Sequence, residues 1–126
     1  MARTSSAQTP LASQTLATGA SDLTSSWLTT GYGVSGWAMV YAASQPTGGL
    51  VFYVEGASDN TGTGAGLIIA GISMVPAGTG SGNAAIVPFA FGIGSGGDWA
   101  YYRVRITAPT GNNATVECEA MVTTGL

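Results

Sequence analysis

The side chains that could carry chemistry are few in this chain of 126 residues. It contains no histidine and no lysine, so a Ser–His–Asp or Cys–His arrangement cannot be built, and acid–base work would fall to carboxylates. The acidic residues in the first hundred positions are Asp22, Glu55, Asp59 and Asp98. A glycosidase needs two facing carboxylates, and no spacing among these four indicates such a pair. The sequence therefore predicts a protein without catalytic residues, and not an enzyme.

Metal and phosphate sites are not indicated either. One cysteine without any histidine cannot build a zinc site. Asp59 and Asn60 could offer oxygens to calcium, but the stretch lacks the spaced acidic ligands of a calcium loop, and a glycine-rich turn is favoured. The run Gly92–Gly97 resembles a phosphate-binding loop only in its glycine content, because a strand is expected after it instead of a helix. No metal and no cofactor are expected.

The single cysteine, Cys118, alternates with apolar residues and is flanked by Glu117 and Glu119. Neighbouring carboxylates raise the pKa of a thiol, which disfavours a nucleophilic role. We interpret Cys118 as a small buried hydrophobic residue, with a reactive thiol as the alternative.

Two expected strands near the C-terminus, joined by a Gly/Asn-rich turn, each carry two charged residues at alternate positions. These are Arg103 and Arg105 in the first strand and Glu117 and Glu119 in the second. Paired as a hairpin, the strands would set Arg105 opposite Glu117 and Arg103 opposite Glu119. We expect this cross-strand ladder to fix the register, because a slip of one residue would bury the charges.

Charged residues make up only 7% of the chain, against roughly 25% in an average soluble protein. Such a surface is solvated by hydroxyls and backbone, and it favours association of copies because charge repulsion is weak. With a net charge of −3 and three arginines, the chain is not expected to bind nucleic acid or an anionic membrane surface. The composition favours a homo-oligomer whose copies pack against one another.

Twenty glycines interrupt any helical periodicity, and β-branched and aromatic runs alternate with turn residues. The expected strands cover Ser13–Thr18, part of Asp22–Tyr32, Gly36–Ala43, Leu50–Ala57, Leu67–Val75, Ala84–Gly92, Trp99–Ala108 and Ala114–Thr123. A bulge is expected at Gly71, and Pro88 indicates an edge strand or a bulge. The sequence thus predicts an all-β protein, a single antiparallel β-sandwich of jelly-roll type over residues 13–126.

Residues Met1–Ala12 are mostly Ser, Thr, Ala and Gln with one proline. We expect an extended N-terminal arm that becomes ordered only where a partner covers it, with Arg3 and Leu11 as contact residues. Since no apolar run follows Arg3, no secretory signal is expected.

Large aromatic residues are expected on outward faces. If Gly36–Ala43 and Leu50–Ala57 form a hairpin, the alternation that buries Ala38, Val40 and Ala42 with Phe52 and Val54 turns another set outward. The outward set comprises Trp37, Met39, Tyr41 and Tyr53, and the charged face of the later hairpin adds Trp99 and Tyr101. Four interpretations stay open: the assignment of the two faces is inverted, both faces of the sheets are buried, the aromatics form a subunit or partner interface, or Trp37, Tyr41 and Tyr53 form a sugar-stacking platform.

Two short motifs carry a resemblance. The segment Phe52–Asp59, with the sequence FYVEGASD, and the segment Tyr101–Ala108, with the sequence YYRVRITA, resemble small bacteriophage virion modules over roughly Gly36 to Thr123. Such modules occur in capsid decoration (cement) proteins, with tail and fibre proteins as near relatives. The resemblance implies a virion protein, made in the host cytoplasm, that binds the major capsid protein or another virion protein, usually as a trimer, and it carries over no catalytic residues.

Taken together, the sequence predicts a phage capsid decoration protein that stabilises the head shell. A tail, baseplate or fibre component is the first alternative, and a carbohydrate-binding module is the second.

Overall fold

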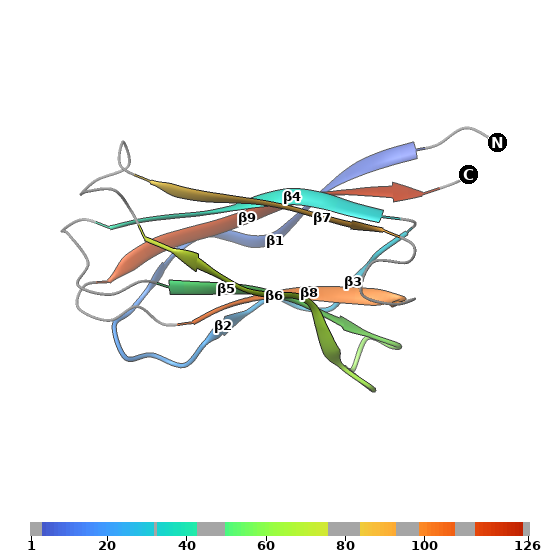
Figure 1. The fold of residues 1–126 in the computed structure, drawn as a ribbon, viewed down its shortest axis with the longest axis horizontal. Helices are drawn as coiled ribbons and strands as arrows, with labels where there is room; N and C mark the ends of the chain where they lie inside the picture. Colours follow the sequence, from blue (N-terminus) through green and yellow to red (C-terminus); the bar gives the residue numbers. More distant parts are fainter. Residues whose placement is uncertain are drawn as a thin grey trace.

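The computed structural model describes residues 4–31, 33–42, 50–75, 84–92, 99–107 and 113–124. They form two antiparallel β-sheets packed face to face, which confirms the predicted all-β sandwich (Figure 1). The strands are β1 (Thr4–Leu16), β2 (Leu23–Thr24), β3 (Leu28–Thr29), β4 (Gly33–Ala42), β5 (Leu50–Ala57), β6 (Gly66–Met74), β7 (Ala85–Gly92), β8 (Tyr101–Ile106) and β9 (Ala114–Thr124). The described residues contain no helix that is long and apolar enough to cross a membrane.

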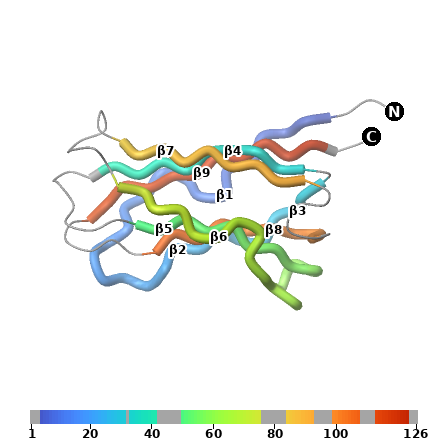
Figure 2. Tube along the Cα trace, viewed as in Figure 1, coloured from blue at the N-terminus to red at the C-terminus, as the bar shows by residue number. Residues whose placement is uncertain are grey.

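The strand order is that of a jelly roll. One sheet has the order β1-β9-β4-β7, and the other has the order β2-β8-β5-β6, with β3 also paired to β8. Most connections cross from one sheet to the other, and only two pairs of consecutive strands, β2 with β3 and β5 with β6, lie within one sheet. In Figure 2 the first and last strands of the chain, β1 and β9, run side by side in the upper layer.

Both hairpins predicted from the sequence are wrong for this reason. Gly36–Ala43 falls on β4 and Leu50–Ala57 on β5, and these strands lie in opposite sheets. Likewise, Trp99–Ala108 contains β8, which pairs with β5, whereas β9 pairs with β1 and β4. A short turn between two strands does not distinguish a hairpin from a link that crosses the sandwich.

The N-terminal arm is not separate from the first predicted strand. Thr4 to Leu16 form the single strand β1, which pairs along β9 from Thr4↔Thr124 to Leu16↔Ala114 with two register shifts. Leu11, predicted as a contact residue, is buried in the core, because one of these shifts turns it inward. The expected boundary between Ala12 and Ser13 therefore falls inside an edge strand.

Alternation places the predicted inward residues correctly, apart from Ala42, whose side chain lies outside the described part of the structure. Ala38, Val40, Phe52 and Val54 are fully buried between the sheets, as are Tyr102, Val104 and Ile106 of β8 and Val116 and Cys118 of β9. The Tyr102 hydroxyl donates a 2.6 Å hydrogen bond to Gln8 Oε1, which ties the core of one sheet to β1 of the other. Burial raises the pKa of Tyr102 far above its usual value, so this donor keeps its proton.

Two local predictions on the edge strands are confirmed. β7, which carries Pro88, is an edge strand of its sheet. Phe52 pairs with Ile72 and Val54 with Ile69, so β6 has one residue more than β5 between these pairs, and Gly71 lies in that bulge.

Candidate functional site

The outer face of the β1-β9-β4-β7 sheet carries an apolar patch. Trp37, Ile86 and Met121 are 37%, 60% and 41% exposed, which is unusual for such large apolar side chains. Trp37 pairs with Pro88, and Met39 pairs with Ile86, so these residues form adjacent rows on β4 and β7. The apolar patch consists of Trp37, Met39, Ile86, Pro88 and Met121. Contiguous exposed apolar areas on a sheet face are typical of binding surfaces, which makes this patch the candidate site.

Two carboxylates border the apolar patch along β9. Glu119 pairs with Trp37 and Glu117 with Met39, so the two glutamates line up beside the apolar rows. Glu119 Oε2 accepts a 2.9 Å hydrogen bond from Thr9 Oγ1 of β1. Neither glutamate takes part in a salt bridge among the described residues. This pair, Glu117 and Glu119, is called the acidic pair below.

An open groove runs beside Trp37 on the same face. Its lining comes from β1, β4 and β9 and comprises Ala7, Ser35, Gly36, Trp37, Glu119, Ala120 and Met121. The groove therefore combines an aromatic ring, a carboxylate and mostly small side chains, an arrangement able to accept a side chain or a small polar ligand.

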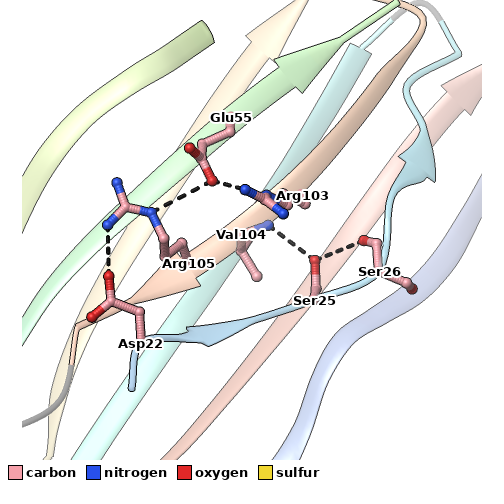
Figure 3. A network of polar contacts seen from close by, with 7 residues as sticks. All are labelled: Asp22, Ser25, Ser26, Glu55, Arg103, Val104 and Arg105. Carbon is pink, nitrogen blue, oxygen red and sulfur yellow. Dashed lines mark hydrogen bonds and ion pairs between the residues drawn. The ribbon is translucent and has the colours of Figure 1, made fainter. Parts of the chain in front are cut away.

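The outer face of the other sheet carries a charge network (Figure 3). Arg103 Nε lies 2.9 Å from Glu55 Oε1, Arg105 Nε lies 3.5 Å from the same oxygen, and Arg105 Nη1 lies 2.9 Å from Asp22 Oδ2. Strand pairing explains the arrangement. Glu55 of β5 lies opposite Arg103, and Tyr53, two residues earlier on the same face of β5, lies opposite Arg105. The Ser25 hydroxyl accepts a 3.0 Å hydrogen bond from the Val104 amide and holds the segment before β3 against β8.

Both arginines of this network also lie over aromatic rings. The Arg103 guanidinium is 4.5 Å from the centroid of Trp27, and that of Arg105 is 4.0 Å from the centroid of Tyr53. Although burial works against its charge, the hydrogen bond to Asp22 and the charge of Glu55 raise the pKa of Arg105. The charges and rings of this network contact one another, so the network stabilises the sheet and offers few unpaired groups to a ligand.

The predicted ladder between Arg103 or Arg105 and Glu117 or Glu119 is wrong. β8 and β9 lie in different sheets and turn their charged residues to opposite outer surfaces of the sandwich. The outward orientation of these four residues is right, but the partners are Glu55 and Asp22 for the arginines.

The predicted aromatic platform is divided between two surfaces. Trp37 and Tyr41 lie on β4, whereas Tyr53 lies on β5 in the opposite sheet beneath Arg105. Trp99 is half-buried, and its ring fills the space where a Cβ of Gly56 would lie. Tyr101 of β8 is also half-buried. Arg3 lies outside the described residues.

One sequence signal agrees with the observed partner of the arginines but does not select it. Glu55 occupies an outward position in the middle of an otherwise apolar strand, as Arg103 does in β8. Isolated charges of opposite sign at such positions favour pairing across neighbouring strands. No comparable signal marks Trp27, which lies outside the strands.

Loss of the Glu55 carboxylate is expected to destabilise the fold. The side chain of Glu55 is only 15% exposed and serves both arginines, so Glu55→Ala should cost about 2 kcal/mol. Asp22 is more exposed and binds Arg105 alone, so Asp22→Ala should cost less than about 1 kcal/mol. Chemical denaturation of both variants measures the difference, and equal losses would contradict a shared role of Glu55.

Cys118 is fully buried, as predicted, and burial together with the charge of Glu119 raises the pKa of its thiol to about 12. The native chain should therefore resist alkylation by iodoacetamide at pH values near 8, and react only when unfolded. The thiol ionises near pH 9.0 in the unfolded chain and only near pH 12 in the folded chain, because its pKa is raised by folding. Its contribution to stability is therefore complete below pH 9 and is lost as the pH rises toward 12. Between these pH values the free energy of unfolding should fall by about 1.4 kcal/mol per pH unit. Cys118→Ala should lack this part of the loss of stability at alkaline pH.

The Asp59 loop has a structural explanation. Asp59 Oδ1 accepts hydrogen bonds from the Thr61 amide, the Thr61 hydroxyl and the Thr63 amide at 2.7–3.1 Å. Hydrogen bonds from Thr63 and Thr61 hold the pKa of Asp59 well below its usual range. No group of three or more potential metal ligands occurs among the described residues. The carboxylate organises the β5–β6 turn, as expected of a glycine-rich turn residue.

No protein-family model and no curated protein sequence matches the chain. Its structure is similar to that of the infectious bursal disease virus VP2 subviral particle, with a TM-score of 0.62 and 12% identity over 97% of this chain and 32% of the viral chain. It is also similar to a family 16 carbohydrate-binding module, with a TM-score of 0.51 and 10% identity over 90% of this chain and 76% of the module. A third similar structure comes from Bacillus endospore appendages, which form a family of disulfide-linked pili, with a TM-score of 0.50 and 11% identity over 100% of this chain and 92% of that one.

This chain spans about a third of the length of the viral chains that it matches. At these identities the likeness concerns the fold. The chain has a β-sandwich fold that also occurs in a viral capsid protein and in a carbohydrate-binding module.

Proposed function

We propose that this chain is a structural protein of a bacteriophage virion, a capsid decoration (cement) protein that binds the head shell and has no catalytic role. The observation that carries the proposal is the apolar patch on the outer face of the β1-β9-β4-β7 sheet. The jelly-roll order, the likeness in fold to a viral capsid protein and the two short motifs support it further.

The mechanism of such a protein is mechanical. The outer sheet face lies against neighbouring shell subunits, and Trp37 and Ile86 are large exposed side chains able to enter apolar depressions there. Each copy contributes modest affinity, and the symmetry of the shell multiplies the contacts. The Arg103–Glu55–Arg105 network joins β5 to β8 in the opposite sheet, which supports the sandwich from the far side of the binding face.

Association of copies belongs to the same proposal. With 7% charged residues the chain has little electrostatic repulsion between copies, and we propose a homo-oligomer, with a trimer as the expected number. Light scattering coupled to size exclusion measures this directly. A monomer at high concentration would contradict the oligomer without touching the assignment of the binding face.

The test of the proposed function is co-sedimentation with empty heads assembled from the major capsid protein of the same genome. Wild-type protein should sediment with heads, and Trp37→Ala should weaken binding by about tenfold or more, since buried aromatic anchors dominate interfaces. Leu67→Ala is the matched control, because Leu67 is 52% exposed on β6 in the other sheet. Binding to tails instead of heads would assign the chain to the tail or baseplate, and equal binding by both variants would contradict the assigned face.

A carbohydrate-binding module is the second candidate, favoured by the groove beside Trp37. Trp37 presents a ring for stacking, Glu119 supplies an acceptor, and the fold also occurs in a carbohydrate-binding module. A glycan array with wild type and Trp37→Ala separates the candidates. Specific glycan binding that the variant loses would favour this second function. Absence of binding to every glycan on the array would favour the virion role.

A further inference from the structure

The face proposed to bind the shell has an uneven distribution of charge. The acidic pair borders the apolar rows on one side, with Glu119 next to Trp37 and Glu117 next to Met39. Successive outward residues of a strand lie about 7 Å apart, so the two carboxylates repel each other across the sheet surface. The cations described in this chain are Arg103 and Arg105, which lie on the opposite sheet and pair with Glu55 and Asp22.

A second copy of this chain is a poor match for that face. The chain has three arginines and no lysine, and two of the arginines are already held by carboxylates. Each copy could thus bring at most one further cationic side chain, that of Arg3, against the two glutamates of the acidic pair. Two copies packed through this face would hold carboxylates against apolar rows or against each other, which is costly without cations.

From this imbalance we infer that the partner of this face is a different protein, whose contact surface presents arginine or lysine side chains to the acidic pair and apolar side chains to Trp37 and Ile86. The inference rests on the proposed function and names the chemistry of the shell surface that the chain recognises. Basic groups there would lie between Glu117 and Glu119 and offset their repulsion. The rows of β4 and β7 would exclude water from the contact.

The probe is a synthetic peptide of alternating leucine and arginine, compared with its leucine–glutamate counterpart, titrated into the isotope-labelled chain by NMR. We expect the Leu–Arg peptide to bind about tenfold more tightly, with shifts at Trp37 and along β9. Raising sodium chloride from about 50 mM to about 500 mM should weaken its binding several-fold, because salt screens exposed charges.

The double variant E117Q/E119Q isolates the charge. It should bind the Leu–Arg peptide about fivefold more weakly at low salt and lose the salt dependence, while Asp22→Asn, on the other sheet, should leave both unchanged. Unchanged affinity and salt dependence in E117Q/E119Q would overturn the inference. If E117Q/E119Q behaved like the wild type but Trp37→Ala still released the chain from heads, the inference of a basic partner surface would fall and the proposed function would stand.

The alternative occupant, a second copy, is tested on the same variants. Their solution mass should equal that of the wild type, because copies do not meet through this face. A shift of E117Q/E119Q or Trp37→Ala to a smaller or larger species would identify the face as a contact between copies and overturn the inference.

Discussion

A chain that lacks residues 1–12 is expected to lose its stable fold. These residues include most of β1, which forms the edge of its sheet and pairs with β9 from Thr124 to Cys118. Burial of Leu11 alone stabilises the fold by roughly 2–3 kcal/mol. The deletion also removes Gln8, the acceptor of the buried Tyr102 hydroxyl, and leaves the edge of β9 unpaired. The total loss should exceed about 4 kcal/mol, a large part of the stability of a small domain.

Thermal denaturation and circular dichroism of the truncated chain measure this loss. Two point variants show its origin: Leu11→Ala should cost about 3 kcal/mol, whereas Ala12→Ser, at an exposed neighbouring position, should cost less than about 0.5 kcal/mol. A truncated chain that melts like the wild type would show that Met1–Ala12 is a dispensable arm, as the composition alone suggested.

The second large effect is expected at Gly36, in the middle of β4. A Cβ at this position would overlap the carbonyl oxygen of Glu119 and lie 2.8 Å from the Cα of Ala120 and 3.0 Å from a ring atom of Phe89. The first two obstacles are backbone atoms of β9, so two central strands would have to move apart. We expect Gly36→Ala to cost about 3 kcal/mol, at the upper end of overpacking in a core.

Ser35→Ala is the matched control for this variant. Ser35 is the exposed neighbour of Gly36 on the same strand, and its loss should change stability by less than about 0.5 kcal/mol. Guanidinium titrations of both proteins give the comparison. Equal midpoints for Gly36→Ala and wild type would show that β4 and β9 can separate freely at this point.

The alternation of apolar and polar residues in the sequence predicts reliably which side chains face the core. It placed Val54, Val104 and Cys118 inside and Trp37 and Arg103 outside, because each strand has one face toward the core and one toward solvent. Alternation is a property of a single strand, so it does not depend on which strand lies next to it.

Strand pairing was the part that could not be predicted. Strands that follow each other in sequence are expected to form hairpins, which sets Arg105 opposite Glu117, but their strands lie in different sheets. In a jelly roll the partner of a strand is usually distant in sequence: Glu55 and Arg103 are 48 residues apart, and Gln8 and Tyr102 are 94 apart. Such pairs are decided by the packing of the whole sandwich, which no short pattern encodes.

The candidate site was predicted in part. Trp37 and Tyr41 were expected outward and lie there, but Ile86 and Met121 were not recognised as members of the same surface. They lie on β7 and β9, which flank β4 only after the chain has crossed between the sheets several times. The apolar patch is thus formed by the strand order of the sheet, and no single segment of the sequence contains it.

Hydroxyl-radical footprinting of the chain, free and bound to heads, tests the central assignment most directly. Trp37 and Met121 are exposed, readily oxidised and located on the proposed binding face. Head binding should reduce oxidation of both residues severalfold and leave Leu67, on the opposite sheet, unchanged. Protection of Leu67 with continued oxidation of Trp37 and Met121 would contradict this assignment and move the binding face to the other sheet.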